Sequence, residues 1–125
     1  MVIVALALPA AASAAVPHNG GHYSQQGGRS PVNLDVTPDG TRVTNFTAFT
    51  DCNPVPLKSP LSMKIDRSGA FHLSTLRKDV LGNGIRVVVS GKFVSRGRAK
   101  GSYKFSAPGC VGRSVAFSAT FQRPE

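Results

Sequence analysis

Acidic residues are scarce in this chain, and their scarcity limits the chemistry that it can perform. The sequence holds six Asp and Glu among 125 residues, and its single Glu is Glu125. Glycosidases place two carboxyl groups across the scissile bond. That pair would have to come from Asp35, Asp51 and Asp79, because the other two aspartates lie in turn sequences. The G-x-S-x-G nucleophile motif is also missing. We therefore expect the protein not to be an enzyme, and an enzyme of unrecognised type is the alternative.

Histidines are few as well, which bears on metal binding. The chain has three, His18, His22 and His72. His18 and His22 lie four residues apart and could share an ion, but zinc takes three or four protein ligands and no cysteine is expected to be free. We therefore predict no metal site and no cofactor.

The sequence has no apolar run long enough to span a membrane. Its first residues are apolar from Val2 to Leu8 and are broken at Pro9, whereas a membrane helix needs about 20 apolar residues. Ala12-Ser13-Ala14 then supplies the A-x-A pattern of a signal peptidase site. We predict that residues 1–15 are a cleaved signal peptide, that no transmembrane segment follows, and that the protein is secreted or extracytoplasmic.

Cysteine is present only twice, as Cys52 and Cys110. In an oxidising compartment, two cysteines without a third thiol to compete are most simply a disulfide. Neither cysteine has His or Cys neighbours at the spacing of metal ligands. The bridge would stabilise the fold by about 4 kcal/mol in the chain-entropy model.

The remainder of the chain alternates apolar and polar residues between turns rich in Gly, Pro and Asp, and no window shows sustained helical spacing. This pattern predicts an all-β fold, an antiparallel sandwich or small barrel of seven or eight short strands with one disulfide. We expect residues 16–30 to be a flexible segment with at most one short strand at Tyr23, and residues 31–125 to form a single β domain.

Two hairpins are predicted from turn chemistry. The turn at residues 37–40 places Leu34 opposite Val43, and the spacing of the following aromatics predicts a β-bulge near Asn45. In the second hairpin, Gly69 takes the left-handed position of a three-residue loop, so that Ile65 faces Phe71 and Met63 faces Leu73.

A third hairpin carries much of the positive charge. The chain has a formal net charge of +9, and residues 80–124 contain eight basic residues and no acid. A loop at residues 95–97 pairs Val94 with Arg98 and sets Lys92 opposite Lys100, while the aromatic side chains occupy the other face. The candidate contacts for a polyanion are Arg86, Lys92, Arg96, Arg98, Lys100 and Lys104.

This charge has two interpretations. The cations are either a solvated surface or a contact for acidic polymer, such as cell-wall polymer or nucleic acid. Because aromatics and cations alternate along the strands, they cannot meet the same ligand. Single-strand binders stack bases on aromatics beside a positive groove, so this pattern weighs against single-stranded nucleic acid.

The turns, core aromatics and cysteines also occur in a recognisable order, namely Tyr23, Asp39-Gly40, Phe46, Cys52, Ser68-Gly69-Ala70-Phe71, Ser90-Gly91-Lys92-Phe93, Gly109-Cys110 and Phe117-Ser118-Ala119. This order resembles a widespread type of small exported bacterial β-protein with paired cysteines. The resemblance covers most of the mature chain, and it implies no activity for any residue.

We expect an exported, non-catalytic binding or structural module, monomeric, whose ligand meets loops such as residues 52–60 or 81–84. The alternative is electrostatic attachment to an anionic polymer through the basic hairpin, in which case the partner is an acidic envelope polymer or nucleic acid.

A mass measurement tests both export and the disulfide. Secreted protein should begin at Ala15 or Val16, and its intact mass should not change on alkylation without reductant, because Cys52 and Cys110 are bonded to each other. Two alkylated thiols in freshly purified protein would contradict the bridge, and an uncleaved leader would contradict the signal peptide.

Overall fold

The computed structural model describes residues 15–25, 32–50, 52 and 57–122, and it is all-β. Every strand is antiparallel to the strands that it pairs with. The eight strands are β1 (His22–Ser24), β2 (Asn33–Val36), β3 (Arg42–Thr47), β4 (Leu61–Lys64), β5 (Ala70–Lys78), β6 (Gly84–Ser95), β7 (Arg98–Ser106) and β8 (Val115–Gln122).

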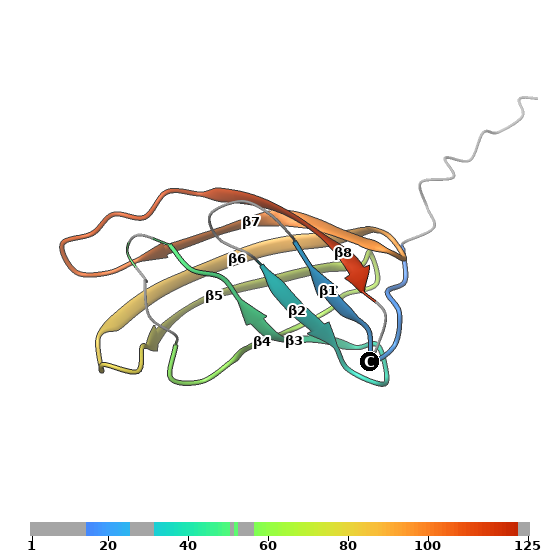
Figure 1. Cartoon of the computed structure of the whole chain (residues 1–125), viewed down its shortest axis with the longest axis horizontal. Coiled ribbons are helices and arrows are strands. Elements are labelled where there is room, and N and C mark those ends of the chain that lie inside the picture. The colour runs from blue at the N-terminus through green and yellow to red at the C-terminus, as the bar shows by residue number, and fades with distance from the viewer. Residues whose placement is uncertain (1–14, 26–31, 51, 53–56, 123–125) are drawn as a thin grey trace, which may run out of the picture.

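The strands form one sheet in the order β4-β3-β2-β1-β8-β7-β6-β5. Two meanders, β1 to β4 and β5 to β8, are therefore joined where β1 pairs with β8 (Figure 1). At the other edges β4 and β5 approach each other, and Ile65 forms an isolated bridge with Phe71 beside the turn that connects them. The sheet is thus nearly closed into a barrel, which confirms the all-β prediction and selects a barrel over a sandwich.

The interior of the barrel is filled by aliphatic and aromatic side chains, and the largest of them are aromatic. Tyr23 contacts Phe93 edge-on, with ring centroids 5.2 Å apart, and Phe46 meets Phe117 at 5.6 Å. Burying a side chain of this size contributes about 1.5–3 kcal/mol. Five aromatic side chains of β5 to β8 are buried on the inner face, namely Phe71, Phe93, Tyr103, Phe105 and Phe117, and Phe121 of β8 is partly buried against them.

The disulfide is present as predicted. Cys52 and Cys110 are bonded, with their Cα atoms 5.6 Å apart. Cys52 follows β3 and Cys110 precedes β8, so the bond links one meander to the other.

The short strand predicted at Tyr23 is present as β1 and belongs to the barrel. β1 pairs with both β2 and β8, and Tyr23 at its centre is fully buried. The Tyr23 hydroxyl donates a hydrogen bond to the Arg96 carbonyl and accepts one from the His18 amide. The β domain therefore includes residues before 31. Residues 26–31, and all of the predicted signal peptide except Ala15, lie outside the described part of the chain.

The first hairpin has the predicted bulge but a different register. Asn45 adopts a φ of 52°, and the pairing of β3 shifts on both of its sides. Val43 lies opposite Val36 and not opposite Leu34. The Thr37 amide donates to the Arg42 carbonyl at 3.0 Å, which moves the four-residue loop to residues 38–41. The shift is two residues, so it preserves which side chains face inward.

The second hairpin is formed only at its turn. Gly69 has a φ of 82° and Ile65 faces Phe71, as predicted. Met63, however, lies opposite Val43 on β3 and not opposite Leu73. The strands diverge after the turn because β4 completes the first meander.

The third hairpin keeps the predicted register along most of its length. Phe93 lies opposite Ala99, and Lys92 lies opposite Lys100. At the turn Ser95, not Val94, faces Arg98, because the register shifts there.

Two glycines face each other at the centre of the long strands. Gly91 and Gly101 are cross-strand partners, flanked in the same row by Phe71 on β5 and Phe117 on β8. A Cβ on Gly101 would lie 2.1 Å from the Ser90 carbonyl oxygen, and one on Gly91 would lie 2.4 Å from the Phe71 ring. The Phe71 and Phe117 rings therefore occupy the space that a side chain on Gly91 would need, and the backbone of β6 occupies the space beside Gly101.

Replacing one glycine tests this packing. Gly101→Ala should lower the free energy of unfolding by about 1–3 kcal/mol, because its neighbour is backbone that must shift. Gly97→Ala is the matched control, since a Cβ there meets nothing within 4 Å, and its stability should be unchanged or slightly raised. Urea denaturation with the disulfide intact measures both, and equal stability of the two variants would contradict the close approach.

Candidate functional site

The six predicted cations lie together on the outer side of one hairpin. Arg86 and Lys92 are on β6, Arg98, Lys100 and Lys104 are on β7, and Arg96 is in the turn between them. All six are exposed. We call this set the basic face.

The centre of the basic face is a cross-strand pair of like charge. Lys92 and Lys100 are direct partners, with Ala70 beside Lys92 on β5 and Ser118 beside Lys100 on β8. Like charges directly opposite each other disfavour pairing of the strands. Small uncharged side chains surround the pair and neutralise none of its charge.

The strands that carry and flank the basic face supply no acidic side chain to balance it. The sequences of β5, β6, β7 and β8, which the structure describes in full, contain no Asp or Glu. None of the six side chains forms a hydrogen bond or ion pair with another described residue; the ion pair found in that part of the chain joins His22 to Asp35. Their charges are therefore available to a partner.

The nearest described carboxylates are held within turns. One Asp66 oxygen accepts hydrogen bonds from the Ser68 amide and hydroxyl and from the Ala70 amide, at 2.8, 2.6 and 3.0 Å. These bonds, the Ser68 hydroxyl first among them, hold the pKa of Asp66 below its usual value, and the charge of Lys92 adds to the effect. Asp66 therefore stays ionised, but its role is to close the turn between β4 and β5.

The turn of the basic hairpin is anchored from inside the barrel. The Tyr23 hydroxyl bonds to the Arg96 carbonyl, and the Phe121 amide donates to the Gly97 carbonyl at 2.8 Å. Burial is the main reason why the pKa of Tyr23 is raised, so the phenol remains a neutral donor at physiological pH. The backbone that carries Arg96 and Arg98 is thus fixed by β1 and β8.

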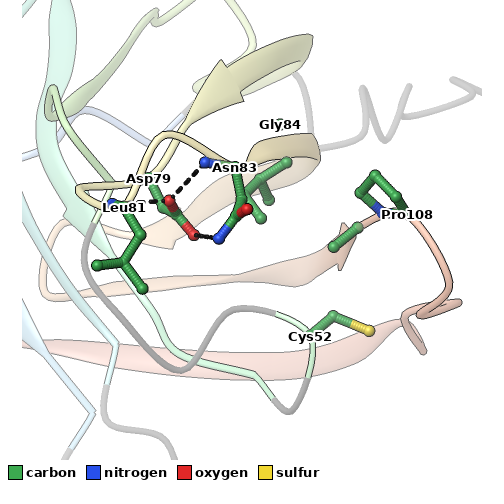
Figure 2. A pocket seen from close by; sticks show the side chains of 8 residues that line it. Cys52, Asp79, Leu81, Asn83, Gly84 and Pro108 are labelled. Carbon is green, nitrogen blue, oxygen red and sulfur yellow. Dashed lines mark hydrogen bonds between the residues drawn. The ribbon is translucent and has the colours of Figure 1, made fainter.

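A pocket lies at the end of the barrel near the disulfide. It has a volume of about 320 Å³, and its lining brings together Cys52, Leu81 and Pro108 (Figure 2). The polar group in it is Asp79, whose oxygens accept from the amides of Leu81 and Asn83 at 2.9 Å each and from the Asn83 side chain at 3.4 Å. These bonds close the turn and engage both oxygens of Asp79.

The structure brings parts of the two predicted recognition loops to this pocket. Cys52 comes from the first loop, and Leu81, Asn83 and Gly84 come from the second. Residues 53–56 of the first loop lie outside the described part of the chain.

The histidines do not gather at one place. His18 stacks on Phe121 with ring centroids 3.9 Å apart, and His72 is exposed on β5. His22 Nδ1 lies 2.5 Å from Asp35 Oδ1, and Asn45 donates to the other Asp35 oxygen at 3.0 Å. Sequence patterns missed this pair because it depends on the pairing of β1 with β2.

Within residues 15–25, 32–50, 52 and 57–122, no group of three or more His, Cys, Asp or Glu is placed to hold a metal ion. The same residues include no helix with the length and apolar character that crossing a membrane requires.

Comparison of the chain with models of protein families, with curated proteins and with solved structures found no match to any of them. The resemblance to exported bacterial β-proteins therefore remains an expectation from the sequence. The structure itself shows a small all-β protein with one disulfide.

Proposed function

We propose that the protein is an exported, non-catalytic binding module that attaches to an acidic polymer through the basic face. Polymers of this kind, such as envelope polymers or nucleic acid, carry anionic groups at regular intervals. The attachment is electrostatic and independent of the detailed sequence of the polymer.

The pairing of Lys92 with Lys100 is the observation that carries this proposal. Two lysines directly opposite each other disfavour pairing of the strands, and the Asp66 carboxylate, whose pKa the charge of Lys92 helps to lower, is held in a turn by its own hydrogen bonds. By contrast, His22 on β1 lies against a carboxylate, that of Asp35. A repeating polyanion would supply the counter-charges that the basic face lacks.

The surroundings of the cations indicate which part of a polymer they contact. Ser90 and Ser102 face each other in the row next to Lys92 and Lys100, and they offer hydroxyl groups without bulk. The aromatic residues of the hairpin are buried, so none can stack on a base or a sugar. Contacts are therefore with phosphate or carboxylate groups.

Two features support the exported location. The predicted signal peptide would direct the chain out of the cytoplasm. The Cys52–Cys110 disulfide is of the kind that persists in oxidising compartments.

A salt titration with a matched charge control tests the proposal. Binding to short duplex DNA should weaken with salt, and Lys92→Gln with Lys100→Gln should lower the log-log slope by about 2, because each lysine that neutralises a phosphate contributes about 0.9. The control is Arg42→Gln with Lys64→Gln, a pair of cations that also face each other, but on β3 and β4. This control removes the same charge and should leave the slope nearly unchanged.

Two results would contradict the basic face as the contact: an unchanged slope in the Lys92/Lys100 variant, or an equal loss in both double variants. The Lys92/Lys100 variant should also unfold at the same or slightly higher urea concentration, because a like-charge pair is removed. Repeating the titration with poly(glycerol phosphate) shows whether an envelope polymer binds more tightly than DNA.

A further inference from the structure

Exposed apolar side chains gather at one end of the barrel. The turn between β5 and β6 and the loop between β7 and β8 both lie there (Figure 1). Leu81 and Pro108 line one pocket with Cys52, so the two segments adjoin (Figure 2). The exposed residues there are Leu76 (64%), Val80 (55%), Leu81 (71%) and Val111 (87%), and we call them the loop end.

The geometry of the turn holds these side chains outward. Asp79 is 3% exposed and bonds the amides of Leu81 and Asn83, which closes the turn tightly. Gly82 has a φ of 87° and lies at the tip. Val111 directly follows Cys110, whose bond to Cys52 anchors the second loop. Val80, Leu81 and Val111 are therefore held at the surface by the fold.

Cationic side chains lie beside these apolar residues. The described carboxylate next to them, Asp79, is already engaged in hydrogen bonds. Lys78, Arg86 and Arg113 are exposed next to the apolar residues. Asp79, the carboxylate of this turn, is buried and hydrogen-bonded. A second copy of the chain would bring cations against cations. An anionic bilayer, in contrast, offers an apolar interior beneath a negatively charged headgroup layer.

We propose that the loop end docks on anionic lipid membranes, with Val80, Leu81 and Val111 inserted among the headgroups and the neighbouring cations at the lipid phosphates. Interfacial binding of this kind combines buried apolar area with attraction to anionic lipid. It uses a different part of the molecule from the centre of the basic face, so the two interactions can be separated by mutation.

Vesicle sedimentation tests the docking. Wild-type protein should bind vesicles of equal parts phosphatidylglycerol and phosphatidylcholine, and it should bind phosphatidylcholine alone much more weakly. Val80→Ser with Val111→Ser should reduce binding to the anionic vesicles about tenfold or more, since each change removes apolar area that the bilayer would bury. Both positions are exposed, so folding should be unaffected.

The control variant makes the same two substitutions at the other end of the barrel. Val16 and Val94 are 66% and 51% exposed. Both lie near Gly69 in the turn between β4 and β5, because the Ala15 carbonyl lies against Gly69 and the Phe93 amide donates to the Gly69 carbonyl. Val94 also adjoins the turn between β6 and β7. Val16→Ser with Val94→Ser should leave vesicle binding unchanged.

Fluorescence gives a second readout. The chain has no Trp, so Leu81→Trp introduces a single indole at the loop end and Val94→Trp introduces one at the opposite end. On anionic vesicles the emission of Leu81→Trp should shift to shorter wavelength, while that of Val94→Trp should not.

Four results would overturn the docking: no binding of the wild type to anionic vesicles, equal binding of the two double variants, binding without an emission shift in Leu81→Trp, or a concentration-dependent shift without vesicles. The third result would mean adsorption through charge alone, and the fourth would mean self-association. Loss of duplex DNA binding in the Lys92/Lys100 variant is scored separately, so failure of one proposal does not imply failure of the other.

Discussion

The contact between the two central strands at Gly91 and Gly101 is the constraint on which the barrel depends. With no Cβ on Gly91, the Phe71 and Phe117 rings lie over its backbone, and with no Cβ on Gly101, β7 lies close to the Ser90 carbonyl of β6. Glycines in strands allow a sheet to curve where the backbone approaches another group closely. Lys92 and Lys100 are the next residues on the convex side. Curvature spreads side chains on that side, which eases the repulsion between the two charges.

The sequence predicted most of what local patterns control. Alternation and the glycine turn placed Lys92 opposite Lys100 and Phe93 opposite Ala99, because each strand there has one buried face. The sequence did not predict that Met63 pairs with Val43, because that pairing joins strands distant in the chain. The short strand at Tyr23 was predicted, but nothing local shows that Tyr23 is covered by both neighbouring strands and by Phe93. The exposure of the cations could be predicted because side chains alternate between the two faces of a strand. The contact between His22 and Asp35 could not, because it depends on which strands are neighbours in the sheet.

Side chains of different character occupy different parts of the molecule. The interior holds aliphatic and aromatic side chains, the outer side of β6 and β7 holds exposed positive charge, and the loop end holds four exposed apolar side chains. The carboxylates of Asp39 and Asp66 accept hydrogen bonds within turns, which lowers the pKa of both. Because turns take up these acids, positive charge dominates the surface of the long strands.

The join between β1 and β8 determines when the barrel can be completed. Most pairings connect strands that follow each other in the chain, and such local hairpins form quickly. The exception pairs His22 with Gln122, so β1 has no partner on that side until almost the whole chain is available. Until then Tyr23 lacks the strand that covers it, and the first meander has an open edge able to pair with other chains. Pairing of β8 with β1 is therefore the step that removes this open edge.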